Sequence, residues 1–373
     1  MTRVDRVLVA AEPGLIEVVE ETVPDLLEDS AFRVQTLYSG LSAGTELSFF
    51  RGTNPFLTAC WDSELGLFRT GTTATGYPVR KLGYMQVGTI TESRSPGHAE
   101  GAVVAMTYGH RAGHTADPLT ERVVAVPADL DPLLGIYAAH MGPICANGLL
   151  HAAAELHGTD VRGLGDGVRG RRVVVTGAGV VGLLTALFAR HHGAAEVVVV
   201  EPAAYRAAAA SALGFEVLDP DAGDIAIELK TRWRNGAGDH GADLVFQCRG
   251  QTATLAVALR LLRPQGAVVD LAFYPDGADA VRLGEEFHHN GLTIRCAQIG
   301  RVPRGTAHLW DRERLSAETI ELLRAEGAAI RAHLITDLVP LEKAPALLDD
   351  ISNHRRDVIQ AVFTFPGHAP TTH

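Results

Sequence analysis

Apolar and polar positions change their spacing near Leu134, and this change divides the chain into two kinds of region. Before Leu134, β-branched or alternating patches are bounded by Gly, Pro or Ser, a pattern typical of short antiparallel strands. The patches are VDRVLVAAEPG, GLIEVVEETVP, FRVQTLYSGLSAGTE, YMQVGTITESRSPGH and AVVAMTYGH. They predict an antiparallel, barrel-like β domain.

After Leu134, stretches with helical spacing alternate with short strand-like runs. The helical stretches are LGIYAAHMGPICANGLLHAAAEL and TATLAVALRLLRP. The strand-like runs lie at 173–175, 197–200, 215–218, 242–248, 266–273 and 292–300. This alternation predicts a parallel sheet with right-handed crossovers. A nucleotide-binding domain inserted into the β domain explains this order of strand-like and helical stretches. We expect residues 1–144 and 301–373 to form the β domain and residues 145–300 to form the inserted domain. The expected fold class is α/β plus β.

The segment from Arg172 to Pro202 has the pattern of a nucleotide-binding βαβ unit. A β-branched run leads into GAGVVG, a helix-length apolar stretch follows, and a second β-branched run ends at Glu201. The first glycine of such a turn permits the tight bend, the second lets backbone approach a pyrophosphate, and the third allows close packing. Free N–H groups at the helix N-terminus favour phosphate. The residues concerned are Gly177, Gly179, Val180, Val181 and Gly182.

Glu201 indicates which dinucleotide is bound. A carboxylate at the end of the second strand accepts hydrogen bonds from the adenosine ribose and would repel the 2′-phosphate of NADP, so we expect NAD. Arg206, in the first turn of the next predicted helix, would weaken this preference and leaves NADP open. The alternative is a Gly-rich turn in a sheet that binds no ligand.

Bulk composition limits the partners. The chain has 33 basic and 44 acidic residues, a formal net charge of −11, which argues against nucleic acid or an anionic membrane surface. No apolar run is long enough for a secretory signal or a membrane span, so we expect a cytoplasmic protein with a small-molecule substrate. The four cysteines lack the paired spacing of a disulfide framework or a structural zinc site.

The order of these parts resembles the medium-chain dehydrogenase/reductase superfamily, the fold of the zinc alcohol dehydrogenases, over essentially the whole chain. GLSAGTEL is similar to its GICGSDxH region, KLGYMQVG to its GHExxG region, MGPICANG to the helix that crosses between its domains, and LLRPQGAVVDLA to its LLRPGGxxVxVG strand. The resemblance implies a GroES-like β-barrel catalytic domain with an inserted Rossmann domain. It also implies an NAD(P)-dependent dehydrogenase or reductase that forms a homodimer.

The positions that hold zinc in this family are altered. The resemblance places Ala43 at the cysteine ligand, Tyr84 and Met85 at the His-Glu pair, and Pro143 at the third ligand. Only the tyrosine is a zinc ligand at all, and a weak one. We therefore predict no zinc. The SAGTE motif, GYMQVG and FHHNGLTIRCAQIGRVP are most similar to the zinc-free, bacteriochlorophyllide-dehydrogenase-like members.

Without a metal, side chains must stabilise the substrate oxygen and move its proton. Thr45 lies where the family's proton relay begins, so we expect it to bond the substrate oxygen or the nicotinamide ribose, or else to stabilise a turn. Tyr84 is a candidate proton donor, or a core residue that fills the vacated volume. Glu46 is a candidate acid/base or a carboxylate behind the relay, and His110 is a candidate for the substrate cleft.

Further cofactor contacts follow from the carboxyl edge of the predicted sheet, where dinucleotides bind. The run Cys248-Arg249-Gly250 ends the fourth predicted strand, and the run Ala272-Phe273-Tyr274 ends the fifth. Gln298 is similar to the stretch that meets the nicotinamide carboxamide in the family.

These observations predict a zinc-independent, NAD-preferring oxidoreductase that interconverts a secondary alcohol and a ketone. The long stretch 50–81 has little periodicity but carries Phe56, Trp61 and Phe68, which favours an ordered loop and a substrate larger than ethanol, such as a polyol, cyclitol or secondary metabolite. The alternatives are an NAD(P)H-dependent reductase of a conjugated C=C bond and a non-catalytic dinucleotide-binding protein.

Overall fold

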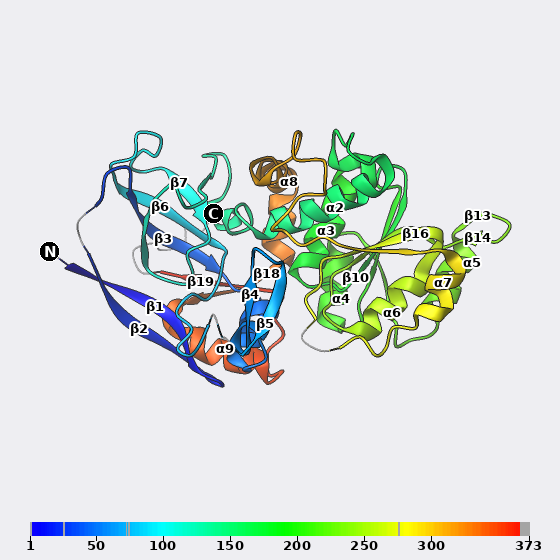
Figure 1. Ribbon diagram of the computed structural model, residues 1–373, viewed down its shortest axis with the longest axis horizontal. Helices are drawn as coiled ribbons and strands as arrows, with labels where there is room; N and C mark the ends of the chain where they lie inside the picture. Colours follow the sequence, from blue (N-terminus) through cyan, green and yellow to red (C-terminus); the bar gives the residue numbers. More distant parts are fainter. Residues whose placement is uncertain (1, 25–26, 72, 74, 275–276, 366–373) are drawn as a thin grey trace. The chain divides into compact units, whose positions relative to one another are not determined.

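The computed structural model describes residues 2–24, 27–71, 73, 75–274 and 277–365. The chain forms two compact units, residues 1–140 with 335–373, and residues 141–334 (Figure 1). Within the described residues, no helix combines the length and the apolar character needed to cross a bilayer.

The first unit is built around a mixed sheet in the order β18-β19-β3-β6-β7-β9, with β8 also paired to β3. Its strands are β3 (Phe32–Gly40), β6 (Gln86–Ser93), β7 (Val103–Met106), β8 (Gly113–Ala116), β9 (Val124–Ala125), β18 (Ile335–Pro340) and β19 (Gln360–Thr364). The long hairpin of β1 (Thr2–Glu12) and β2 (Leu15–Pro24) is joined to this unit by a bridge between Val7 and Arg111. Chain from before and after the second unit therefore shares one β domain, in the order expected for an inserted nucleotide-binding domain.

Helices of the first unit close its apolar core. α1 (Ala43–Phe50) and α9 (Ala344–Ser352) contribute Leu47 and Leu348 to a buried cluster that also holds Leu8 and Phe363. The short helices η2 (Pro132–Tyr137) and η5 (Leu341–Lys343) complete the unit. The SAGTE motif was included in a strand-like patch, but from Ala43 it belongs to α1. A helix forms there because Ser42 carbonyl accepts the N–H of Glu46 at 2.9 Å and starts the turn.

The 50–81 stretch contains more regular structure than its weak periodicity predicts. After η1 (Pro55–Leu57), strands β4 (Ala59–Asp62) and β5 (Leu67–Thr70) form an antiparallel hairpin. Its aromatics pack edge to face, with the Trp61 and Phe68 ring centroids 5.1 Å apart and those of Phe56 and Phe68 5.4 Å apart.

The second unit has a six-stranded parallel sheet in the order β12-β11-β10-β15-β16-β17. The strands are β10 (Arg172–Thr176), β11 (Glu196–Val200), β12 (Glu216–Leu218), β15 (Ala242–Gln247), β16 (Leu262–Asp270) and β17 (Thr293–Cys296). A small hairpin of β13 (Arg234–Gly236) and β14 (Asp239–His240) precedes β15. The order reverses between β10 and β15, which is the point where such sheets bind nucleotides.

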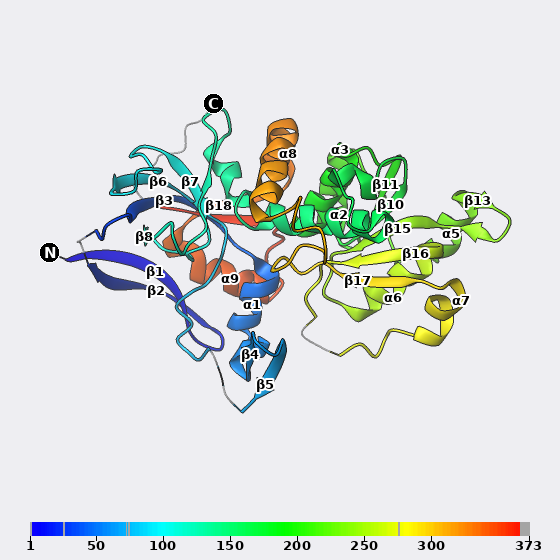
Figure 2. The ribbon, with the colours of Figure 1, turned by 45° about the horizontal axis from the view of Figure 1, so that its top comes forward.

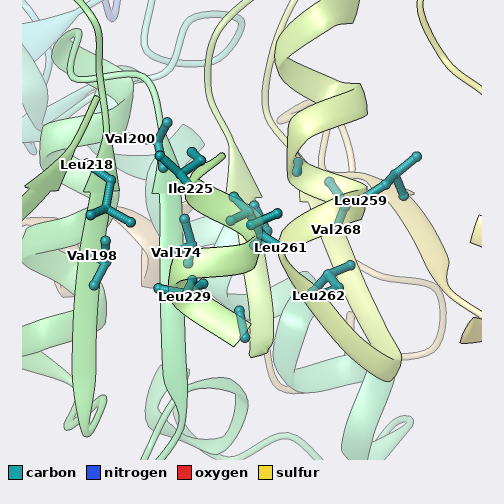
Figure 3. Close-up of a cluster of buried hydrophobic side chains, with 14 of the residues drawn as sticks. Val174, Val198, Val200, Leu218, Ile225, Leu229, Leu259, Leu261, Leu262 and Val268 are labelled. Atoms are coloured by element: carbon teal, nitrogen blue, oxygen red, sulfur yellow. The ribbon is translucent and has the colours of Figure 1, made fainter. Parts of the chain in front are cut away.

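Helices cover both faces of this sheet (Figure 2). One group is α2 (Met141–His157), α3 (Val180–His191) and α8 (Arg312–His333), which contact one another. The other contains α5 (Ile225–Arg232) and α6 (Thr252–Leu261), whose apolar side chains pack on the strands in a buried cluster (Figure 3). Shorter elements are η3 (Leu164–Gly167), α4 (Ala204–Ala212), η4 (Leu283–Phe287) and α7 (His288–Asn290). Burial on both faces explains the continuous apolar runs of the strands.

Residues 301–334 lie in the second unit. The sequence pattern instead places them in the segment 301–373, where the chain comes back to the β domain. The reason is the packing of α8. A Cβ added to Gly142 of α2 would lie 2.1 Å from the Thr319 methyl of α8, so the two helices approach closely. Arg190 of α3 pairs with Glu326 of α8 at 3.1 Å. These contacts, which one sequence does not reveal, hold α8 on the nucleotide-binding unit.

Candidate cofactor and substrate sites

The Gly-rich turn between β10 and α3 depends on its glycines. Gly177 adopts φ = 96°, which disfavours any other residue, and its N–H donates to the Val200 carbonyl at 2.8 Å. A Cβ on Gly182 would lie 1.7 Å from the Gly177 carbonyl oxygen. A Cβ on Gly179 would meet nothing within 4 Å. The turn therefore leaves open space beside the start of α3, where Val180 and Val181 form the first turn and offer N–H groups to a pyrophosphate.

Glu201 lies at the end of β11 and is 1% exposed. One carboxylate oxygen accepts the N–H of Ala178 at 2.8 Å, and the other accepts the N–H of Ala203 at 2.9 Å. The carboxylate thus braces the Gly-rich turn from behind. Arg206 lies in α4, with its guanidinium 5.2 Å from the centre of the Tyr205 ring. Its Nε is buried without a hydrogen-bond partner among the described residues.

The other predicted cofactor residues lie at the carboxyl edge of the same sheet. Cys248 follows β15, and its N–H donates to the Thr176 carbonyl at 3.0 Å. Ala272 and the half-exposed Phe273 follow β16. Gln298 is exposed after β17. The structure therefore brings these residues and the Gly-rich turn to one edge.

Asn147 of α2 holds the segment that contains Gln298. Its buried side-chain amide lies 3.4, 3.3 and 3.2 Å from the carbonyl oxygens of Ala297, Gln298 and Arg301. Sequence reasoning missed this residue, because it gave no reason to connect an asparagine on α2 with a loop after β17.

In the first unit lies Tyr84, the residue that the sequence resemblance aligns with a zinc-binding histidine. The hydroxyls of Tyr84 and Ser42 are hydrogen-bonded to each other. The Tyr84 ring stands edge to face against His140, with centroids 4.6 Å apart. Ser42 directly precedes α1, and Thr45 lies in the first turn of that helix, half-buried.

Glu46, in the same helix as Thr45, forms a buried pair with His110. His110 Nε2 lies 2.6 Å from Glu46 Oε2, and the two side chains are 0% and 2% exposed. The other Glu46 oxygen accepts the N–H of Ser42 at 2.7 Å. His110 Nδ1 lies 2.5 Å from the Ser39 hydroxyl, which accepts a 2.9 Å bond from Gln86. His110 is thus placed behind the site rather than at its surface.

This network contains residues that sequence reasoning did not select, namely Ser39, Ser42 and Gln86. Ser42 had a signal, since it lies in the SAGTE motif beside the altered metal positions. Gln86 had a similar signal, since it follows Met85 in the GYMQVG motif. Ser39 had none, because it meets Gln86 only after β3 and β6 have paired.

The altered metal positions do not fit zinc. Ala43 carries no donor atom, and Met85 is fully buried and packed against Gly40, whose added Cβ would lie 2.9 Å from the Met85 methyl. The Tyr84 hydroxyl is already bonded to Ser42. Across the part of the chain that the structure describes, no three His, Cys, Asp or Glu side chains are grouped as a metal site.

Comparison with known proteins identifies similar dehydrogenases. Residues 180–312 match the family model described as zinc-binding dehydrogenase. D-guloside 3-dehydrogenase of Shigella flexneri is 28% identical over 96% of this chain and 99% of its own length. The Escherichia coli protein of the same name is 28% identical over 96% and 99%.

Solved structures show the same fold. Galactitol-1-phosphate dehydrogenase from Escherichia coli superposes with a TM-score of 0.72 over 96% of this chain and 99% of that one, at 16% identity. A Sinorhizobium meliloti protein described as a zinc-binding dehydrogenase and bound to NADP has a TM-score of 0.71 over 97% and 99%, at 19% identity.

The chain has the fold of the medium-chain dehydrogenases, with a GroES-like domain and a Rossmann domain, and its sequence is similar to those of dehydrogenases. It is an NAD(P)-dependent oxidoreductase that acts on a small molecule. The predicted fold class and enzyme class are thereby confirmed.

Proposed function

We propose that this enzyme interconverts a secondary alcohol and a ketone on a sugar or polyol derivative, without zinc and with NAD as the preferred cofactor. The observation that carries the proposal is the Tyr84–Ser42 hydroxyl pair at the altered metal position. The polyhydroxy substrate class is supported by relatives named for a guloside and by structural neighbours named for galactitol 1-phosphate and L-idonate.

In this proposal the bound nicotinamide supplies or accepts the hydride. Tyr84 donates its proton to the substrate oxygen during ketone reduction and accepts it during alcohol oxidation. The Ser42 hydroxyl donates a hydrogen bond to the tyrosine oxygen as negative charge develops there. Thr45 orients the substrate oxygen from the first turn of α1.

Glu46 and His110 act on this site as positioning residues. Glu46 holds the Ser42 backbone, while His110 holds Glu46 from the opposite side. A buried and fully hydrogen-bonded arrangement of this kind keeps the Ser42 hydroxyl in one orientation toward Tyr84. Neither residue is proposed to touch the substrate.

The preference for NAD rests on Glu201. Its buried carboxylate places negative charge directly behind the turn that receives the adenosine half of the cofactor, which disfavours a 2′-phosphate. Arg206, whose Nε lacks a partner, opposes this effect. NADP is therefore accepted, but more weakly.

The first experiment is oxidation of NADH and NADPH by chelator-treated protein, with matched panels of ketosugars and conjugated enones. We expect turnover of ketosugars with NADH, undiminished by chelation and not increased by added zinc. Activity that appears only with zinc would refute metal independence. Turnover of the enones alone would assign the enzyme to C=C reduction.

A variant pair tests the role of Tyr84. Tyr84→Phe should lower kcat by roughly 10²–10³, because the proton donor is lost. Tyr108→Phe is the control, since it also removes a buried hydroxyl, which contacts Thr36 at 2.7 Å on the same unit. Equal activity of the two variants would show that Tyr84 only fills the vacated volume.

We also propose a homodimer, paired through the edge of the parallel sheet at β17, since among the described strands β17 has a neighbour on one side only. Light scattering during gel filtration tests this, and a monomeric mass would refute it.

A further inference from the structure

One chain of side-chain hydrogen bonds joins three strand ends of the parallel sheet. The Thr176 hydroxyl donates to the Gln247 side-chain carbonyl. The Gln247 amide donates to the Tyr274 hydroxyl at 3.1 Å and to the Arg249 carbonyl at 2.8 Å. Tyr274 in turn donates to an Asp270 carboxylate oxygen at 2.9 Å. None of these residues has a part in the proposed chemistry.

The chain lies at the edge that receives the cofactor. Thr176, Gln247 and Asp270 are the last residues of β10, β15 and β16. Each is followed by a segment already assigned to cofactor binding, namely the Gly-rich turn, residues 248–250 and residues 271–274. The network therefore joins the bases of all three segments.

The same three segments touch each other through their backbones. A Cβ on Gly250 would lie 2.1 Å from the Phe273 carbonyl oxygen. A Cβ on Gly177 would lie 3.1 Å from the Arg249 Cβ. A shift of one segment must therefore move the next.

The polar groups of this network satisfy one another. Gln247 is 0% and Asp270 is 7% exposed, and the second Asp270 oxygen accepts the N–H of Ala272 at 2.9 Å. Burial raises the pKa of Tyr274, which keeps the phenol protonated as the donor to Asp270. A buried network with every member paired selects one geometry, whereas a network with one member removed does not.

We propose that Tyr274 is a positioning residue for the dinucleotide. Its hydroxyl holds residues 248–250 and 271–274 at the spacing that the bound cofactor requires. The inference rests on the cofactor part of the proposed function, and it adds a residue that neither the Gly-rich motif nor the altered metal positions indicate.

The test is Tyr274→Phe, with the dissociation constant of NADH measured by fluorescence titration. We expect binding about five- to tenfold weaker, as for a lost, partly buried hydrogen bond, with kcat at saturating NADH unchanged. Tyr108→Phe is the control. It removes a buried hydroxyl from the other unit, so its melting temperature should fall similarly while NADH binding stays the same.

Three outcomes would overturn the inference. The first is a lower melting temperature of Tyr274→Phe with unchanged NADH affinity, which indicates a structural role alone. If that variant does not fold, Asp270→Asn replaces it, because it preserves side-chain size but removes one of the two acceptors, and unchanged affinity there is the second. The third is a wild-type protein that binds neither NADH nor NADPH, which would refute the proposed cofactor use as well.

Discussion

The Gly-rich turn of the second unit and the Tyr84 region of the first form their sites in different ways. The turn uses backbone N–H groups and empty space, and a side chain on Gly182 would collide with the Gly177 carbonyl. The Tyr84 region uses side chains: the Tyr84 and Ser42 hydroxyls bond to each other, and Met85 is fully buried. A site formed by backbone therefore tolerates little change, whereas a site formed by side chains can change its chemistry within the same fold.

Of the variants that test this difference between the two regions, Gly182→Ala is expected to change stability and cofactor binding most. Because the new Cβ would lie 1.7 Å from a carbonyl oxygen, the turn must move, and we expect the free energy of unfolding to fall by about 3 kcal/mol or more. NADH binding should be lost. Gly179→Ala, whose Cβ meets nothing, should keep its stability and lose only affinity. Urea unfolding and NADH titration measure both quantities, and equal destabilisation of the two variants would contradict this account.

The next effect is expected from Glu46→Ala in the Tyr84 region. It leaves His110 and the Ser42 N–H without their buried acceptor, and we expect a loss of about 3 kcal/mol in the free energy of unfolding. Glu121→Ala is the matched control. Its pair with His114 has a similar length of 2.7 Å but is partly exposed, so the loss should stay below about 1 kcal/mol. Similar urea midpoints for the two variants would show that burial of the Glu46 pair is unimportant.

A smaller effect is expected from Arg206, the side chain that we propose to modify cofactor preference at the Gly-rich turn. Arg206→Ala should raise the KM for NADPH about tenfold, equivalent to about 1.4 kcal/mol, because the guanidinium no longer offsets the negative charge of Glu201. The KM for NADH should stay within about twofold, as for a surface side chain that contacts no phosphate. Steady-state kinetics with each cofactor separates the two, and a parallel rise in both constants would assign Arg206 to the structure of α4.

A separate effect, which appears only as the pH falls, concerns a buried histidine of the second unit for which, unlike His110, no carboxylate partner is found among the described residues. Burial, with a contribution from the charge of Arg295, lowers the pKa of His151 to about 4. Its unfolded pKa is about 6.5, so the unfolded chain binds more protons between these values. Stability is then complete above about pH 6.5 and declines toward pH 4, by at most about 1.4 kcal/mol per pH unit.

His151→Gln should reduce this decline, since it removes the group that takes up the proton. Urea midpoints at pH 7 and pH 5, for wild type and variant, give the difference directly. An identical decline in both proteins would assign the acid sensitivity to other groups.

Local patterns predicted the nucleotide-binding unit well. Strand, GAGVVG turn and helix appear where the periodicity and the glycines indicate, because each depends on neighbours in the sequence. The weakest predictions were α1 and the β4–β5 hairpin. The small residues before Thr45 carry little helical periodicity, and strands as short as Ala59–Asp62 leave too few alternations to recognise.

The candidate site was predicted in part. Thr45, Glu46 and Tyr84 followed from the resemblance, and their catalytic and positioning roles stay predictions. Their partners did not follow, because Ser42 lies 42 positions from Tyr84 and Glu46 lies 64 positions from His110. Asn147 was missed for the same reason, whereas Tyr274 was placed at the cofactor edge of the sheet without its hydrogen-bond partners.

The sequence by itself determined the cofactor-binding turn, the alternation that makes the sheet parallel, and the absence of zinc-type donors at Ala43 and Met85. These are properties of residue identity and of short spacing. Only the tertiary structure decided that His110 lies behind Glu46, that Ser42 meets Tyr84, and that α8 belongs to the nucleotide unit. Each of these requires distant segments to be buried together, and burial makes a polar side chain find the partner that the fold, rather than the local sequence, puts beside it.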